Sequence, residues 1–258
     1  MTQMIDLHCH ILSGIDDGAL NDDISLKMAQ KAVSEGIHTI VATPHHQNGR
    51  YLNEKKDIVQ YVQKLNELLK QKKLPLIILP GQEIRLYGEI LEDYRADKIL
   101  TLNDTGKYLF IEFPSSQVPH YAERLLFNIQ SQGLIPIIVH PERNSRLLEE
   151  PDLLYKFITN GALAQVTAGS VTGHFGKKIK KFSHQLIQSN LVHFVSSDAH
   201  NLEGRSFYMR EALEAIESEH GQDTVYMFLE NAQYVIHGQM CYKEPPEMIK
   251  KKKFLGIF

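Results

Sequence analysis

The sequence lacks tryptophan altogether and has only two cysteines, Cys9 and Cys241, among its 258 residues. Two cysteines cannot form a disulfide framework, and so few are typical of a protein from a reducing compartment. No apolar run approaches the ~20 residues that cross a bilayer. The first residues carry acids and histidines where a secretory signal needs a basic end and a clean apolar run. These absences predict a soluble cytoplasmic protein.

The sequence also lacks an excess of positive charge. Its 28 Lys and Arg residues face 31 Asp and Glu residues, which gives a net charge of −3, so no overall basic field favours nucleic-acid binding. The hydrophobic fraction of 43% is that of an ordinary globular protein. No repeat, low-complexity tract or flexible linker divides the chain. We therefore expect one domain over residues 1–258, with its core at about residues 4–240, because α/β barrels commonly run to about 250 residues as one unit.

Short apolar runs rich in β-branched residues alternate with stretches of helical periodicity. The runs cover residues 4–7, 39–42, 76–79, 108–113, 135–139, 163–166 and 192–195, and the helical stretches 24–34, 55–72, 121–131, 151–160, 178–189 and 206–219. Because the runs are nearly continuous, they predict strands buried on both faces of a parallel sheet. Alternating β and α units require right-handed crossovers, so the expected fold is a barrel or a doubly wound sheet.

The last residues, 245–258, differ in composition from the rest of the chain. Two prolines, Pro245 and Pro246, are followed by a basic run over 250–253 and an apolar end over 254–258. This pattern predicts a short terminal helix whose apolar end docks on the body of the protein. The alternative is a contact with a membrane or a partner.

Residues that can bind a metal follow nearly every predicted strand. The motifs are HCH after the first strand, TPHH after the second, GQE after the third, IEF in the fourth, HPER after the fifth and SDAH after the seventh. In parallel α/β folds the carboxyl ends of the strands converge where active sites form. The candidate ligands that we expect to meet in one cleft are His8, His10, Asp16 or Asp17, His45 or His46, Glu83, Glu112, His140, Asp198 and His200.

The local patterns favour ligand roles over structural ones. His8 and His10 point to the same side of an extended strand because they are two residues apart, and Asp198 and His200 repeat this spacing. Glu112 lies within an apolar run, where a carboxylate is costly unless it is paired or bound to a cation. The remaining histidines are interpreted as structural or solvated: His38, His120, His174, His184, His193, His220 and His237. Of these, His174 in the GSVTGHFG segment is the strongest candidate for another role.

The candidate donors are imidazoles and carboxylates, without a thiolate. This set suits Mn²⁺, Fe²⁺, Zn²⁺ or Co²⁺, and it is too large for one ion, because a catalytic zinc site uses about three protein ligands. We therefore expect two or three ions with a bridging carboxylate. Arg143 and Arg205 follow two of the ligand motifs. Their guanidinium groups match phosphate oxygens, which predicts an anionic phosphate substrate.

Two other phosphate-binding mechanisms are excluded. A cysteine-dependent phosphatase needs an arginine six residues after its cysteine, but Ile15 and Glu247 occupy those positions. The glycine-rich segment GSVTGHFGKK over 169–178 resembles a P-loop only superficially. Val171 stands where that motif needs glycine, and Lys178 stands where it needs serine or threonine.

Together, the motifs DLHCHILSGIDDG, TPHH, GQE, IEF, HPER and SSDAHN followed by an arginine resemble the polymerase-and-histidinol-phosphatase (PHP) superfamily, most closely its bacterial tyrosine-protein phosphatases of the CpsB/CapC type. The resemblance implies a distorted seven-stranded (β/α)7 TIM-like barrel with a trinuclear, usually manganese-dependent centre at the carboxyl ends of the strands. It also implies hydrolysis of phosphotyrosine on a bacterial tyrosine kinase and its substrates, in the regulation of capsule or exopolysaccharide synthesis.

The resemblance also assigns roles to residues. It implies metal ligands at His8, His10, Asp17, His45, Glu83, Glu112, His140, Asp198 and His200, with the phosphate held by Arg143 and Arg205. Asp17 is preferred to Asp16 because the acid directly before the glycine is the ligand in that family. Three alternatives remain: a histidinol-phosphate phosphatase, a PHP-type nuclease or other phosphoesterase, and a regulatory module that a metal stabilises without catalysis. The net charge of −3 does not favour the nuclease.

Overall fold

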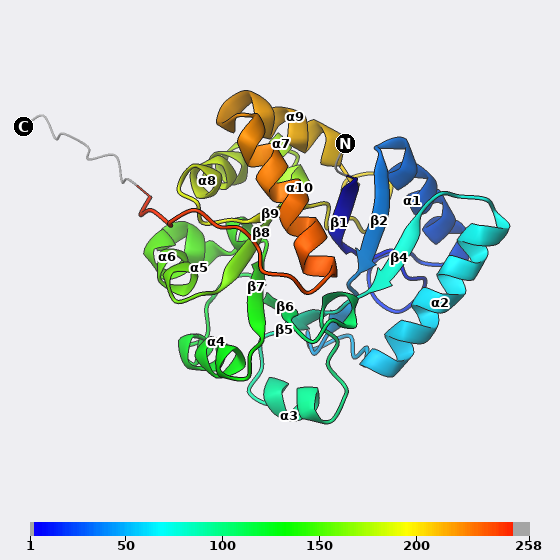
Figure 1. Cartoon of the computed structure of the whole chain (residues 1–258), viewed down its shortest axis with the longest axis horizontal. Helices are drawn as coiled ribbons and strands as arrows, with labels where there is room; N and C mark the ends of the chain where they lie inside the picture. The colour runs from blue at the N-terminus through cyan, green and yellow to red at the C-terminus, as the bar shows by residue number, and fades with distance from the viewer. Residues whose placement is uncertain (1–2, 250–258) are drawn as a thin grey trace, which may run out of the picture.

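The computed structural model describes residues 3–249. It consists of parallel strands surrounded by helices (Figure 1). The strands are β1 (Met4–Cys9), β2 (Ile37–Ala42), β3 (His45–His46), β4 (Ile77–Pro80), β5 (Glu83–Arg85), β6 (Tyr108–Glu112), β7 (Ile135–Val139), β8 (Leu163–Thr167) and β9 (Phe194–Ser196). The helices are α1 (Asp22–Ser34), α2 (Lys55–Gln71), α3 (Ile90–Arg95), α4 (Ala122–Ser131), α5 (Ser145–Glu149), α6 (Pro151–Thr159), α7 (Ala168–Thr172), α8 (Lys177–Gln188), α9 (Met209–His220) and α10 (Gln222–Ile236).

The strands form two parallel sheets, ordered β1-β2-β4 and β3-β5-β6-β7-β8-β9. The expected α/β class with parallel strands is confirmed, and each predicted run forms a strand. Two further short strands, β3 and β5, were not predicted. Both are continuations: β2 and β4 each stop for two residues and then resume as a short strand in the second sheet.

Local sequence explains why the two strands change sheet. Pro44 has no N–H to donate to a ladder, and its carbonyl accepts a hydrogen bond from the Glu83 N–H at 3.1 Å. Gly81 packs so closely that a Cβ there would lie 2.6 Å from Cγ1 of Val41. After these breaks, β3 and β5 pair in register with His45 opposite Glu83. Two candidate ligands are therefore neighbours because both strands are interrupted.

The two sheets meet where β1 lies beside the segment that follows β9. Cys9 and Ala199 form an isolated parallel bridge, and the N–H of Asp198 donates to the carbonyl of His8 at 2.8 Å. The N–H of His10 donates to the carbonyl of Ala199 at 2.9 Å. The first and last ligand motifs of the sequence therefore lie side by side.

Helix α2 shows how the sheets are covered. Its residues Ile58, Val62, Leu65 and Leu69, spaced three and four apart, are all buried, as its amphipathic pattern predicts. A second apolar cluster includes Ile5, Tyr108, Leu163 and Phe194, each in the first two residues of its strand, together with Val235 and Ile236. Its last two members belong to α10, which packs against β1 and β9. The amino ends of the strands are therefore closed by apolar packing.

The predicted helices are present with small shifts at their ends, but α3, α5, α7 and α10 were not predicted. Residues 239–249 have no regular secondary structure. They lie against the end of α8, where Asn190 Nδ2 donates to the Pro245 carbonyl at 3.0 Å and the Glu247 N–H donates to the Ser189 carbonyl at 2.8 Å. The predicted docking of the apolar end concerns residues outside the described range. Within residues 3–249, no helix is long and apolar enough to cross a membrane.

Candidate metal centre

The candidate ligands from the sequence meet at the carboxyl ends of the strands. All are buried except Asp17, whose side chain is 40% exposed. His140 and Asp198 have positive φ angles, 35° and 52°, which cost residues with a side chain about 1–3 kcal/mol each. Such strain is maintained only where the surrounding structure enforces it, and here it occurs at two converging side chains.

A first group joins His8, His10, Glu83 and Asp198. The Nε2 atoms of the two histidines lie 3.3 Å apart. Glu83 Oε2 lies 3.4 Å from Nε2 of His8 and 3.3 Å from Nε2 of His10, and Asp198 Oδ1 lies 3.4 Å from both. In a tetrahedral site with metal–ligand distances of 2.0–2.2 Å, neighbouring ligand atoms are about 3.3–3.6 Å apart. These atoms therefore have the spacing of a metal cage.

A second group surrounds the same glutamate. His45 Nδ1 lies 2.8 Å from Glu83 Oε2 and 3.8 Å from Glu112 Oε2. His140 Nε2 lies 2.8 Å from Glu83 Oε1 and 4.0 Å from Glu112 Oε1. Glu83 thus reaches the first group with one oxygen and the second group with both. This is the geometry that a bridging carboxylate needs.

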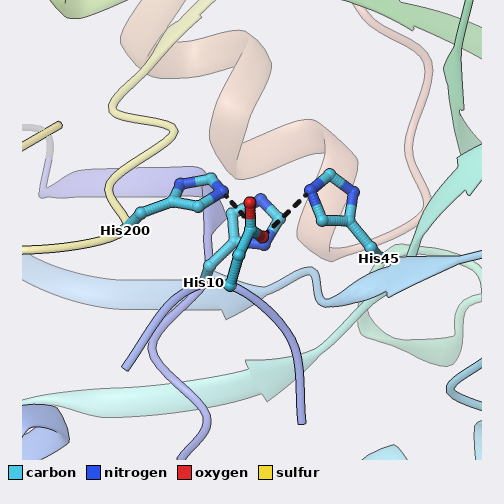
Figure 2. A group of neighbouring side chains, drawn as sticks. His10, His45 and His200 are labelled. Atoms are coloured by element: carbon cyan, nitrogen blue, oxygen red, sulfur yellow. Dashed lines mark ion pairs between the residues drawn. The ribbon is translucent and has the colours of Figure 1, made fainter. Parts of the chain in front are cut away.

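A third group contains Asp17, His10, His45 and His200. Asp17 Oδ1 lies 3.3 Å from Nε2 of His45 and 3.5 Å from Nε2 of His200. Figure 2 shows the rings of His45 and His200 on either side of His10, each turned toward the centre of the group. The structure therefore offers three adjoining places for a cation.

Hydrogen bonds behind the histidines orient their rings. His10 Nδ1 donates to Asp16 Oδ2 at 2.7 Å, and His8 Nδ1 donates to Gln165 Oε1 at 3.0 Å. Since these partners hold the proton on Nδ1, they leave the Nε2 lone pairs facing the cluster, as is usual for histidines that bind metals. Asp16 and Asp17 therefore have different positions, the first behind His10 and the second beside His45 and His200.

Gln165 was not predicted by the sequence analysis. Its signal was a polar residue within the apolar run 163–166, the same signal that identified Glu112. His46, the competitor of His45, points elsewhere: its Nδ1 donates to the Asn53 carbonyl at 2.8 Å.

Three arginines border the cluster. Arg143 and Arg205 both donate to Asp198 Oδ2, Arg205 from Nη2 at 3.0 Å, and the Arg143 guanidinium lies 5.5 Å from the centre of the Phe175 ring. Arg85 was not predicted, and its Nε donates to Glu112 Oε2 at 2.9 Å. It lies two residues after Glu83 in β5, the same spacing as between His8 and His10 in β1. All three guanidinium groups remain partly exposed.

Several of the converging atoms have no hydrogen-bond partner. His45 Nδ1, Glu83 Oε2, Asp198 Oδ1 and His200 Nε2 are buried and unsatisfied. A buried polar atom without a partner is destabilising by about 1–3 kcal/mol. Cations bound in the three groups would satisfy these atoms, so the residues present fit a metal centre.

The protonation states divide the converging groups into two sets. Burial would raise the pKa of Glu83, but His45 and His8 hold the pKa of that carboxyl well below its ordinary value. Arg143 holds the pKa of Asp198 low in the same way, against burial. Burial lowers the pKa of His140 and of His200 to about 4, which leaves these imidazoles neutral, as metal binding requires.

The other set holds protons when no metal is bound. Against burial, Asp16 raises the pKa of His10 well above its ordinary value, and Glu83 raises the pKa of His45 to about 9. Burial raises the pKa of Glu112 to about 7. Metal binding at these residues would therefore release protons.

Comparison with known proteins points the same way. The model of a family described as capsular polysaccharide synthesis, CpsB/CapC, matches residues 4–237. The tyrosine-protein phosphatase YwqE of Bacillus subtilis is 48% identical over 255 residues, which cover 99% of this chain and 100% of YwqE. The tyrosine-protein phosphatase CpsB of Streptococcus pneumoniae is 30% identical over 243 residues, which cover 92% of this chain and 100% of that protein.

Solved structures are similar too. A crystal structure from work on YwqE of Bacillus subtilis and CpsB of Streptococcus pneumoniae, described as unique metal-dependent tyrosine phosphatases, has a TM-score of 0.94 and 48% identity, and the match covers 96% of this chain and 100% of that one. A phosphotriesterase homology protein from Escherichia coli has a TM-score of 0.57 at 13% identity, with 87% and 94% of the two chains covered, which shows a likeness of fold alone.

Proposed function

This chain belongs to the CpsB/CapC family of capsular polysaccharide synthesis, and we propose that it is a metal-dependent tyrosine-protein phosphatase. The observation that carries the proposal is the cluster of buried, unpartnered ligand atoms bordered by arginines. The relatives named above are tyrosine-protein phosphatases. A phosphatase that needs no protein nucleophile agrees with the state of Cys9, because burial and then Asp6 raise the pKa of that buried thiol well above its ordinary value.

We assign the metal ligands by the three groups of atoms. A first ion would be held by His8, His10, Glu83 and Asp198, and a second by Glu83, Glu112 and His140 with His45 nearby. A third would be held by Asp17, His45 and His200. Two or three divalent ions satisfy this set, and we propose Mn²⁺, with Fe²⁺, Zn²⁺ and Co²⁺ as chemically suitable substitutes.

The phosphate is bound at the arginine border. When bound, divalent ions polarise phosphate oxygens and lower the pKa of water so that hydroxide is available near pH 7. Each guanidinium has five N–H donors, so Arg143 and Arg205 retain donors for phosphate oxygens beyond those that contact Asp198. These donors stabilise the negative charge on the phosphoryl oxygens in the transition state. The tyrosine phenolate is a fair leaving group, so strong general-acid assistance is unnecessary.

A cleft of about 60 Å³ lies beside the second group and is lined by Glu112, Phe113, His140 and Arg143 among others. We propose that the phosphotyrosine side chain approaches along this side, where an aromatic ring and a guanidinium lie next to the ligands. The protein substrates are a bacterial tyrosine kinase and its targets in the cytoplasm, acted on during capsule or exopolysaccharide synthesis.

We also infer that the two sheets close into one distorted barrel and that the chain is a single domain. The support is the hydrogen bonding of β1 to the segment after β9 and the continuation of β2 and β4 into the second sheet. The barrel places every ligand-bearing strand end on the same side of the molecule.

Metal removal tests the proposed function. We expect EDTA to abolish hydrolysis of p-nitrophenyl phosphate and of a phosphotyrosine peptide, and added Mn²⁺ to restore both. Histidinol phosphate serves as the comparison substrate and should be hydrolysed far more slowly than the peptide. Full activity in excess chelator would refute the metal mechanism, and a preference for histidinol phosphate would refute the substrate class.

A further inference from the structure

A separate cluster of side chains that can bind a metal lies outside the candidate metal centre. His184 projects from α8, and Glu219 and His220 lie at the carboxyl end of α9. Nδ1 of His184 lies 2.9 Å from Nε2 of His220 and 3.2 Å from Oε2 of Glu219, and the two rings stack with 5.2 Å between their centres. We propose that these three residues bind one Zn²⁺ ion, independently of the phosphatase reaction.

The tautomer of His184 favours a ligand role. Its Nε2 lies 3.1 Å from the Val171 carbonyl, which can only accept a hydrogen bond, so Nε2 carries the proton. In the neutral ring, Nδ1 then presents a lone pair to Glu219 and His220. A backbone carbonyl that fixes the outer nitrogen is the arrangement typical of metal-binding histidines.

Three donor atoms converge between the two helices. They are a lone pair of His184 Nδ1, a carboxylate oxygen of Glu219 and Nε2 of His220. One proton can join only two of these atoms, whereas one metal ion can bond to all three.

The distances are close to those of a zinc site. Tetrahedral Zn²⁺ with bonds of 2.0–2.1 Å places its ligand atoms about 3.3 Å apart, so the observed separations need to widen by only a few tenths of an ångström. The pair that must separate is His184 Nδ1 and His220 Nε2, and His220 can make this adjustment because it is the last residue of α9 and only partly buried. Three protein ligands leave one position open for water or an anion.

The surroundings select the class of metal. The cleft, of about 470 Å³, is also lined by Lys177, Lys180 and Lys181. These ammonium groups oppose every divalent cation, so binding depends on direct bonds to the donor atoms. Two imidazoles with one carboxylate favour Zn²⁺ over Mg²⁺ or Ca²⁺, since zinc bonds readily to imidazole nitrogen. The ion would join α8 to the end of α9.

The test compares His220→Gln with the matched control His237→Gln, which changes an exposed histidine just after α10. Zinc bound per chain is measured by competition with a chromophoric chelator at micromolar Zn²⁺, and crystals of the full-length chain grown with Zn²⁺ are examined for anomalous scattering at the zinc edge. We expect His220→Gln to bind one zinc fewer than the wild type and the control. Its Mn²⁺-dependent phosphatase activity and its Tm without zinc should be unchanged.

The anomalous map should contain a peak bonded to His184 Nδ1 and His220 Nε2, separate from the peaks of the main centre. Zinc peaks at the main centre alone would overturn the proposal. So would equal zinc stoichiometry in the two variants, even with a crystal peak present, because that result means binding at crystal concentration only. If His220→Gln lowers the Tm without zinc, His184→Asn must lose the same zinc, or the proposal fails.

Discussion

The two ends of the same strands are built on opposite principles. At the amino ends, Ile5 and Tyr108 belong to an apolar cluster that α10 covers. At the carboxyl ends of those strands, the side chains of His8 and Glu112 face other polar groups. The apolar end stabilises the fold by excluding water, whereas the polar end contains unpartnered atoms and strained backbone. Function and stability are therefore separated along each strand, and substitutions at the two ends should have separable effects.

Loss of the shared carboxylate should give the largest effect on activity. Glu83→Gln removes the negative charge common to two ligand groups, so we expect kcat/KM to fall by at least about 10³-fold. In the absence of metal the variant should lose less stability than a core truncation, because the amide keeps an oxygen for His140 Nε2, which lies 2.8 Å from Glu83 Oε1, and only the ionic contribution of His45 is lost. Kinetics with Mn²⁺ and thermal unfolding in EDTA measure the two effects. A large loss of metal-free stability would contradict the separation.

Truncation of a buried side chain at the apolar end should lower stability and leave activity unchanged. Phe194→Ala empties part of the apolar cluster, which should reduce the free energy of unfolding by about 3–5 kcal/mol. Since Phe194 belongs to the apolar cluster and its described ring contact is with His193, which is not a candidate ligand, kcat measured well below the Tm should stay close to the wild-type value. Denaturant unfolding and kinetics at low temperature provide the measurements. A fall in kcat comparable to that of Glu83→Gln would show that the two ends are coupled.

Removal of a guanidinium group at the polar end should lower activity without changing metal content. We expect Arg143→Ala to lower kcat/KM by about 10²–10³-fold, because it removes donors to the phosphoryl oxygens. Metal content should not change, since no donor atom to metal is lost. Arg146→Ala is the matched control, as Arg146 is exposed and pairs with Glu150 at 2.8 Å. Unchanged kinetics for Arg143→Ala would show that the assigned phosphate role is wrong.

Protonation of His193, at the apolar end, should have the smallest effect, and this effect is on the free energy of unfolding. Burial, and then Lys243, lower the pKa of His193 to about 3, while the unfolded chain has the ordinary value of about 6.5. Below pH 6.5 the unfolded state binds a proton that the folded state does not, so stability is lost as pH falls toward 3. The loss should reach about 1.4 kcal/mol near pH 5.5.

His193→Asn should remove this part of the acid sensitivity, because Asn Oδ1 can replace His193 Nδ1 as the acceptor for the Ala164 N–H. Free energies of unfolding at pH 7 and pH 5.5 provide the measurement. An identical pH dependence in wild type and variant would contradict the assignment.

Much of the fold and of the candidate site was predictable from local patterns. Apolar runs and helical periodicity located the long strands and six of the helices. The short strands β3 and β5 were missed because two or three residues show no periodicity. Their pairing depends on the interruptions at Pro44 and Gly81, which gain meaning only beside neighbouring strands. The tyrosine phosphatase function, expected from the motifs, agrees with the relatives to which this chain is similar.

The sequence was sufficient to predict which residues are candidate ligands and that they follow the strands, because chain direction and side-chain alternation are local properties. Which of their atoms share a position became known only from the packing of the folded chain. It separated Asp16 from Asp17 and His45 from His46, and it added Arg85 and Gln165 to the site. It also brought His184 next to His220, although both were interpreted as structural or solvated. Such contacts depend on how distant helices and strands pack, and no local pattern in a single sequence contains that information.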